Sequence, residues 1–316
     1  ALPILDIIIG GPPCQAYSVA GRVRDENGMK DDYRNYLFEH YLSVVNRYQP
    51  KVFVFENVPG LLSAMSDGTP IIQLIESGFS SIGYEIVDDV KKYAKVDASD
   101  YGVPQNRERL IILGIRKDLC EDVQVILHRF YLEILPKYKS KKKKTVAEAI
   151  GDLPKITPII NDEELKSRIG YSKPECHTTW HRARHHSLRD VEIYRMLAND
   201  IQSGRNEYVD SKSLSDLYEE KVGAKSPIHR YHVLRADEPS TTIISHLDRD
   251  GNRFIHYDPE QGRDITPREA ARIQSFDDDF DFIGNQTDTY IMIGNAVPPL
   301  LAKCVGLAVS EVLDIL

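Results

Sequence analysis

One cysteine stands where an apolar segment gives way to a rigid loop. Residues 4–9 are almost entirely apolar, which predicts a buried parallel strand, and the sequence Gly-Gly-Pro-Pro-Cys-Gln follows at residues 10–15. Its glycines and prolines end the strand and restrict the loop. Ligands of open α/β sheets bind at the carboxyl ends of the strands, so Cys14 is a candidate nucleophile. The alternative is a cysteine that packs as a small hydrophobic residue.

A carboxylate ends the next predicted strand. Residues 52–55 are apolar and β-branched or aromatic, and Glu56 and Asn57 follow directly. A carboxyl group next to such a strand is partly desolvated, which raises its pKa and suits a proton donor near neutral pH. An ordinary helix-capping pair after a strand is the alternative interpretation.

Two arginines precede the apolar strand predicted at residues 109–115. In an extended segment Gln105, Arg107 and Arg109 would point to one face, because side chains alternate along a strand. Two guanidinium groups on one face can hold a carbonyl oxygen or phosphates through forked hydrogen bonds. A solvated strand start is the alternative.

These motifs, in this order, resemble those of the DNA (cytosine-5) methyltransferases. The resemblance rests on six segments and covers most of the chain except a middle stretch: Pro-Pro-Cys-Gln at 12–15, the helix start at 32–38, Glu-Asn-Val at 56–58, Gln-x-Arg-x-Arg at 105–109, the arginine-bearing segment 266–276, and Ile-Gly-Asn-Ala-Val-Pro-Pro at 293–299. Each segment is a weak signal alone, whereas six in family order are specific.

The resemblance implies methylation of C5 of a flipped-out cytosine in a specific double-stranded DNA sequence, with S-adenosylmethionine as cofactor. Cys14 would add to C6 as a thiolate, and C5 would then attack the methyl group. Glu56 would bind the N3 edge of the base. Arg109, with Arg107 as a second candidate, would hold O2 and supply positive potential. The target base must leave the duplex for this chemistry.

Further contacts follow from the same resemblance. Substrate contacts are expected from Gln15, Gln105 and Ser18, the last within a loop at residues 16–33 whose composition suits a mobile lid. Cofactor contacts are expected from Gly11, Pro13, Leu37 and Asn295, although plain packing or turn roles are alternatives for Pro13, Leu37 and Asn295.

The sequence departs from the family in one respect. The family's catalytic domain normally begins with a strand and a Phe-x-Gly-x-Gly loop that holds the cofactor, and no such loop occurs in these residues. We expect it on an N-terminal segment or on a second chain. A non-catalytic or half-enzyme DNA-binding subunit is therefore one alternative function. A transfer-RNA cytosine-5 methyltransferase is another, although the Cys-Phe-Thr signature of that subgroup is missing.

Composition sets the outer limits. With 316 residues, 41% of them hydrophobic, the chain can form two domains, and it has no apolar run that predicts a membrane span. Four scattered cysteines suit a reducing compartment. The resemblance to DNA methyltransferases then implies a cytoplasmic protein associated with a bacterial nucleoid, or one that is otherwise intracellular. The net charge of −8 means that DNA binding must depend on local basic patches.

The predicted fold is α/β, a Rossmann-like methyltransferase sheet with a second, smaller target-recognition domain. We expect a catalytic domain at 1–150, a target-recognition domain at 151–287, and a C-terminal helix at 288–316 that returns to the catalytic domain. Expected helices cover 35–47, 70–81, 146–150, 187–202, 266–275 and 300–315; expected strands cover 4–9, 52–56, 85–90, 109–115, 241–245 and 254–257.

Two polar clusters have open interpretations. The basic run at 137–144 is a solvated linker or a phosphate-contacting loop. Cys176 and the histidines that follow it could bind zinc by spacing, but arginines interleave with them and a second cysteine pair is lacking, so we expect a basic surface and no metal. Trp180 is expected to anchor a core there.

Overall fold

The structure is a computed structural model that describes residues 5–12, 37–66, 68–160, 168–225 and 231–316. Pro13, Cys14, Gln15 and Ser18, and the expected lid at 16–33, lie outside the described residues. The chain divides into two compact units. The first comprises Ala1–Tyr101, Glu108–Ser140 and Ala302–Leu316, and the second comprises Gly102–Arg107 and Lys141–Leu301.

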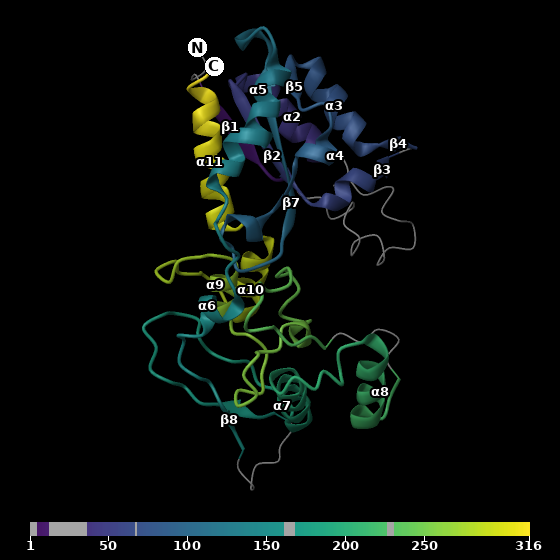
Figure 1. Ribbon diagram of the computed structural model, residues 1–316, viewed down its shortest axis with the longest axis vertical. Coiled ribbons are helices and arrows are strands. Elements are labelled where there is room, and N and C mark those ends of the chain that lie inside the picture. Colours follow the sequence, from purple (N-terminus) through teal and green to yellow (C-terminus); the bar gives the residue numbers. More distant parts are fainter. Residues whose placement is uncertain (1–4, 13–36, 67, 161–167, 226–230) are drawn as a thin grey trace. The chain divides into compact units, whose positions relative to one another are not determined.

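A five-stranded sheet forms the centre of the first unit (Figure 1). Strands β1 and β2 are parallel, and the long strand β7 runs antiparallel to β2, β5 and β6, giving the order β1-β2-β7-β5 with β6 also on β7. The bounds are Ile7–Gly10 (β1), Val52–Asn57 (β2), Tyr84–Ile86 (β5), Lys95–Asp97 (β6) and Glu108–Arg116 (β7), and Met65–Ser66 (β3) pairs with Thr69–Pro70 (β4). The expected strands at 52–56 and 109–115 are confirmed, whereas the strand expected at 85–90 ends at Ile86.

Aromatic packing seats the helices on this sheet. Phe53 and Phe55 of β2 contact Tyr41 and Phe79, which come from two helices, and the Phe53 and Phe79 rings stack at 4.0 Å. Gly114, opposite Phe53 in the ladder, leaves room for the Phe53 ring, because a Cβ there would overlap it. The helices that belong to this unit wholly or in large part are Leu37–Tyr48 (α2), Ile71–Ser81 (α3), Val90–Tyr93 (α4), Val123–Arg129 (α5) and Pro299–Leu313 (α11).

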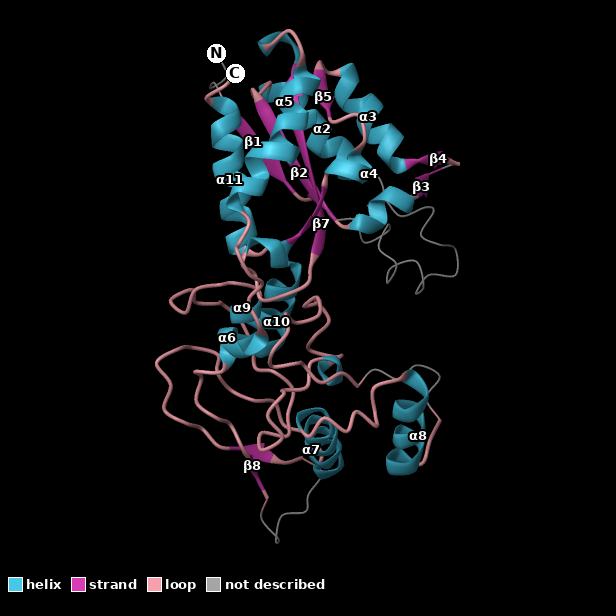
Figure 2. Cartoon of the chain, viewed as in Figure 1, coloured by secondary structure: helices cyan, strands magenta, loops and turns pink. Residues whose placement is uncertain are grey.

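The second unit is built mostly from helices and loops (Figure 2). Its helices are Val146–Ile150 (α6), Leu188–Gln202 (α7), Ser211–Val222 (α8), Pro267–Ile273 (α9) and Gln286–Asn295 (α10), and its short strands are Pro158–Ile159 (β8) and Gly170–Tyr171 (β9). Side-chain caps explain where several begin: Thr145 with Glu148, Thr266 with Glu269, and Asn285 with Asp288 form capping boxes.

One expectation for this unit is wrong. Residues 241–245 and 254–257 are not strands, although Ile243, Phe254 and Ile255 are buried. They bury their side chains without a ladder partner, and Ile255 makes only isolated bridges, to Val233 and Asp264. The helix expected at 300–315 is confirmed by α11, and the segment 288–316 also contains the end of α10, which stops at Asn295 before α11 begins at Pro299.

The compact units divide the chain differently from the expected ranges. Residues 102–107 and the segments 141–150 and 288–301 belong to the second unit, whereas Ala302–Leu316 belongs to the first. The hydrophobic core of the second unit explains the placement of α6, because Val146 and Ile150 pack there with Ile243 and Ile293. The functional boundaries at 150 and 287 remain predictions.

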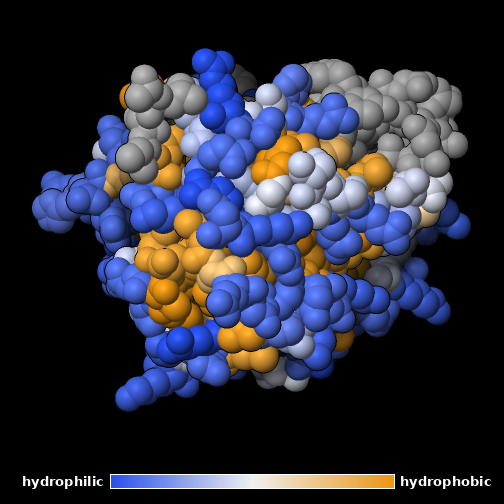
Figure 3. Space-filling view, turned by 90° about the horizontal axis from the view of Figure 1, so that it is seen from above, coloured by the Kyte–Doolittle hydropathy of each residue, from blue (hydrophilic) through white to orange (hydrophobic). Residues whose placement is uncertain are grey.

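Apolar surface is distributed in small areas. Figure 3 shows such areas between hydrophilic ones on the face that it draws. Scattered apolar side chains are ordinary on folded proteins. The stretch Gln286–Leu313 is apolar and long enough to cross a membrane by length and composition alone, which is weak evidence, and it contains the break between α10 and α11.

Candidate active site

A partly buried ion pair lies at the end of β2 and the beginning of β7. Arg109 Nε is 3.0 Å from Glu56 Oε1, and the two side chains are 13% and 17% exposed. Burial lowers the pKa of Arg109, and the negative charge of Glu56 opposes that shift. Because β2 and β7 are antiparallel neighbours, the last residues of one strand meet the first residues of the other. The antiparallel ladder therefore brings together two predicted site residues that are far apart in sequence.

The loop that leads to Cys14 is attached to the same sheet edge. Asn57 Nδ2 donates to the Pro12 carbonyl oxygen at 3.3 Å, and its Oδ1 accepts from Val58 N at 2.8 Å. A Cβ on Gly11 would lie 2.8 Å from Glu56 Oε2, so a side chain at this position would press on the carboxylate. Gly11 thus lets the loop backbone pass close to the Glu56 carboxylate at the carboxyl ends of two parallel strands.

Tyr41 of α2 links the strands β1 and β2, and the sequence analysis missed it. Its hydroxyl group lies 3.1 Å from the Ile8 carbonyl oxygen and 2.9 Å from that of Val54, and burial raises the pKa of the phenol above its usual range. The ring lies where a Cβ on Gly10 would be. Leu37, the expected cofactor contact, is partly buried one turn earlier in α2. An aromatic residue four positions after Leu37 was the available signal.

The sequence analysis expected Gln105 and Arg107 to share a strand face with Arg109, and this expectation is wrong. β7 begins at Glu108, and both residues are buried in the second unit. Arg107 donates to the carbonyl oxygens of Ile243, Gly294 and Ala296 at 2.7, 2.9 and 3.1 Å. Within the second unit, its guanidinium group is therefore bonded to backbone carbonyls of two distant segments.

A pair of glutamines extends this network. Gln105 Nε2 donates to Gln274 Oε1 at 2.5 Å, and Gln105 Oε1 accepts from Ile243 N at 2.8 Å. Gln274 Nε2 donates to the carbonyl oxygens of Ile293 and Ala296 at 3.0 and 2.7 Å. The side chains of Arg107 and Gln274 thus satisfy carbonyl groups that the C-terminus of α10 leaves without helical partners.

The expected cofactor residue Asn295 sits at this helix end. It is exposed, and it is flanked by Gly294 and Ala296, whose carbonyls the network holds. A Cβ on Gly294 would overlap the backbone of Ile244 and Ser245, so this close approach requires glycine. The glycine in the Gly-Asn-Ala-Val segment is therefore required by packing, and the asparagine is the exposed last residue of α10.

The histidine-rich segment serves the interior of the second unit. His181 lies 2.8 Å from the Pro154 carbonyl oxygen and 3.2 Å from Thr266 Oγ1, and His186 lies 2.9 Å from the Tyr171 hydroxyl. Among the residues that the structure describes, no group of three His, Cys, Asp or Glu side chains could hold a metal ion. Trp180 is partly buried against a core cluster, and its Nε1 donates to the Phe282 carbonyl oxygen.

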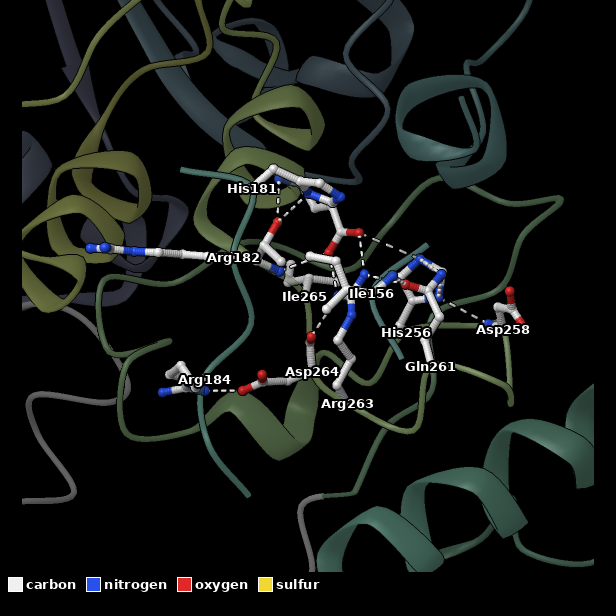
Figure 4. Close-up of polar contacts among 12 residues, drawn as sticks. Ile156, His181, Arg182, Arg184, His256, Asp258, Gln261, Arg263, Asp264 and Ile265 are labelled. Atoms are coloured by element: carbon white, nitrogen blue, oxygen red, sulfur yellow. Dashed lines mark hydrogen bonds and ion pairs between the residues drawn. The ribbon is translucent and has the colours of Figure 1, made fainter. Parts of the chain in front are cut away.

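A buried charge network underlies the late arginine-bearing helix (Figure 4). Arg263 makes two bonds of 2.7 Å to the Glu269 carboxylate. Arg268 donates to carbonyl oxygens of Thr179, Asp277 and Phe280. The Arg263 and Arg268 side chains are fully buried, and Glu269 is 1% exposed. These arginines organise the second unit, and Arg268 lies in the arginine-bearing segment 266–276 that the sequence analysis singled out.

A model of the C-5 cytosine-specific DNA methylase family matches residues 1–311. This chain belongs to that family. The protein is therefore a DNA cytosine-5 methyltransferase, and its mixed α/β sheet is the Rossmann-like methyltransferase fold.

Two named relatives of this cytosine-5 methyltransferase come from bacteria. The Type II methyltransferase M.Bpa9945I of Bacillus paralicheniformis is 35% identical over 327 residues, which cover 98% of this chain and 71% of that protein. The Type II methyltransferase M1.HphI of Haemophilus parahaemolyticus is 33% identical, covering 97% and 68% of the two chains. A crystal structure described as a DNA modification methyltransferase of an E. coli prophage superposes with a TM-score of 0.56 at 25% identity, over 98% of this chain and 79% of that one.

Proposed function

We propose that this enzyme methylates C5 of a flipped-out cytosine in a specific double-stranded DNA sequence, with S-adenosylmethionine as the donor, inside a bacterial cell as part of a restriction–modification system. The partly buried Glu56–Arg109 pair, beside the loop that leads to Cys14, carries the proposal. The names of the Type II relatives support the restriction–modification context.

In this mechanism Cys14 adds to C6 as a thiolate. Glu56 binds the N3 edge of the base and shares a proton there, so negative charge leaves the ring as the thiolate adds. Arg109, oriented by Glu56, donates to O2 of the base. The donor, when bound, supplies an electrophilic methyl group. C5 then loses its proton to a base or water, and the thiolate departs.

The described residues fit part of a donor site. Gly11 leaves backbone bare beside Glu56, and Leu37 offers a partly buried apolar contact at the first turn of α2. In the second unit, Asn295 offers an exposed amide at the end of α10, next to the Ala296 carbonyl oxygen that Arg107 and Gln274 bind. Gly11, Leu37 and Asn295 are therefore proposed as donor contacts, with Pro13 as a further one outside the described residues.

We assign Gln105 and Arg107 a positioning role in this function. Both are buried among backbone groups and the Gln274 side chain, so they hold the segment that carries Asn295. The substrate contacts are then Gln15 and Ser18, together with Glu56 and Arg109 on the base itself.

Covalent capture tests the proposal. A duplex in which 5-fluorocytosine replaces the target cytosine cannot release its C5 substituent, so it should trap the protein in a complex stable to denaturation. Peptide mapping should find the base on Cys14. The Cys14→Ser variant should form no adduct and transfer no methyl group, because serine lacks a usable anion at neutral pH.

Cys304→Ser is the matched control and should be captured like the unchanged protein, since Cys304 lies on α11 and burial raises the pKa of its thiol. Capture on Cys120, Cys176 or Cys304 would show that the nucleophile is misassigned.

A further inference from the structure

A turn in the second unit presents two arginines to solvent. Arg249 and Arg253 are exposed, and the turn between them is closed by backbone bonds from Arg249 N and Asp250 N to the His246 carbonyl oxygen and from Arg253 N to that of Asp250. Residues Gly251–Arg253 form one turn of 3-10 helix. The turn, residues 248–253, therefore holds its arginines in a defined geometry.

A buried ion pair anchors this turn from behind (Figure 4). Arg184 donates to the Asp248 carbonyl oxygen and pairs with Asp264, whose side chain is 1% exposed. The Arg184 guanidinium also lies over the Tyr290 ring, 5.3 Å from its centroid. Any Cβ on Gly251 would overlap the Arg184 and Asp264 side chains. The turn thus packs directly on the ion pair, and glycine is required at the contact.

The charges of the turn are not displayed equally. Arg249 Nε forms an ion pair with Asp248 Oδ2 at 3.7 Å. The Asp248 side chain is 12% exposed, whereas that of Arg249 is 82% exposed. Burial lowers the pKa of His232, as do the positive charges of Arg235 and Arg253, whereas Glu238 opposes the shift, so both arginines lie near this histidine. Asp248 and Asp250 balance the two arginines of the turn in formal charge, but Arg249 and Arg253 are its exposed charged residues, so the turn presents guanidinium groups to solvent.

We propose that the turn at residues 248–253 is a DNA-contacting element that reads the target sequence, with Arg249 on a guanine edge and Arg253 on a phosphate. The inference rests on the proposed function and names the part of the second unit that carries specificity. Arginine binds O6 and N7 of guanine with two parallel hydrogen bonds, which demands a rigid presentation. Arg253 lies with the other cations, which suits a phosphate contact.

Mapping of methylated cytosines tests the proposal. The full chain is expressed in a host that lacks cytosine methylation, and the methylated positions of its DNA are sequenced. Arg249→Ala should relax one guanine position of the methylated sequence, with a loss of about 10- to 100-fold in methylation rate at the original sites. Arg253→Ala should keep the sequence and reduce the slope of log binding constant against log salt concentration by about 1.

Lys155→Ala is the matched control, because the neighbouring Asp258 and Glu260 carboxylates, 2.9 and 2.6 Å away, already neutralise this exposed cation. It should leave sequence and salt slope unchanged. Base reading by Arg249 would be overturned if Arg249→Ala methylated the same DNA sequence at the same rate. It would also be overturned if the variant lost methylation rate equally on all DNA sequences. An unchanged protein that binds duplex DNA but methylates no cytosine would instead contradict the proposed function.

Discussion

At the scale of single residues, the Glu56–Arg109 pair is the most informative feature. An ion pair with side chains 13% and 17% exposed has given up much of its hydration, and it needs a reason beyond stability, because apolar residues of similar size would cost less. A polar pair at the carboxyl end of a strand, next to a bare glycine, is suited to bind a planar heterocycle through its nitrogen and oxygen edges.

Replacing the carboxylate should separate catalysis from structure. Glu56→Gln keeps the shape and a hydrogen bond to Arg109 but loses the shared proton, so we expect kcat to fall by roughly 100-fold or more with DNA affinity within a few-fold. Glu56→Ala should also lower the free energy of unfolding, by about 3 kcal/mol, because Arg109 loses its partner.

Single-turnover methyl transfer measures the first effect, and urea unfolding measures the second. A Glu56→Gln enzyme with the full rate would remove this carboxylate from the chemistry.

At the scale of elements, the end of α10 shows how a positioning residue works. The carbonyl groups of Ile293, Gly294 and Ala296 point away from the helix, and Arg107 and Gln274 bind them. A cation is also favourable at a helix C-terminus. The end of α10, which carries Asn295, therefore depends on the side chain of Arg107 in the segment just before β7.

Arg107→Lys tests this dependence. Lysine keeps the charge but cannot reach three carbonyls with a planar fork, so the variant should weaken donor binding about 10-fold and lower stability by about 2 kcal/mol. Calorimetry with S-adenosylmethionine reports the first effect, and Asn295→Ala should weaken binding similarly. A lower kcat with unchanged donor affinity would instead place Arg107 among the groups that act on the base.

At the scale of the whole molecule, buried charges make the second unit sensitive to acid. Burial lowers the pKa of His256 to about 4, although Glu269 next to it opposes the shift. The pairing with Arg263 lowers the pKa of Glu269 to about 2 against the effect of burial. Both groups therefore bind protons more readily in the unfolded chain, and folding stability falls as the pH drops.

His256 causes the loss of stability at the higher pH of the two groups. Its contribution to the free energy of unfolding is fully present above the unfolded pKa of about 6.5 and is lost as the pH falls toward 4. This contribution is on the order of 3 kcal/mol. In the unchanged protein, Asp258 N donates to His256 Nδ1 at 3.0 Å. His256→Asn keeps an acceptor for this hydrogen bond, and the variant should lose less free energy of unfolding between pH 7 and pH 5.

Urea unfolding at the two pH values measures this difference. Equal losses in the variant and the unchanged protein would show that His256 does not cause the acid sensitivity.

The sequence by itself determined the elements whose signals are local. The apolar runs of β2 and β7 and the capping residues of α6 and α9 are readable from nearest neighbours, and so Glu56 and Arg109 could be assigned to strand ends. The family motifs added the chemistry that Cys14 would perform.

Only the tertiary structure decided the partners of residues that look alike in sequence. Arg107 and Arg109 alternate as strand residues would, yet Arg107 binds carbonyls 136 to 189 positions away, whereas Arg109 binds Glu56. Likewise, residues 254–257 have an apolar strand pattern but no ladder partner. A buried polar group or a strand is completed by hydrogen bonds to distant backbone, and such partners are set by the packing of the whole chain rather than by the local pattern.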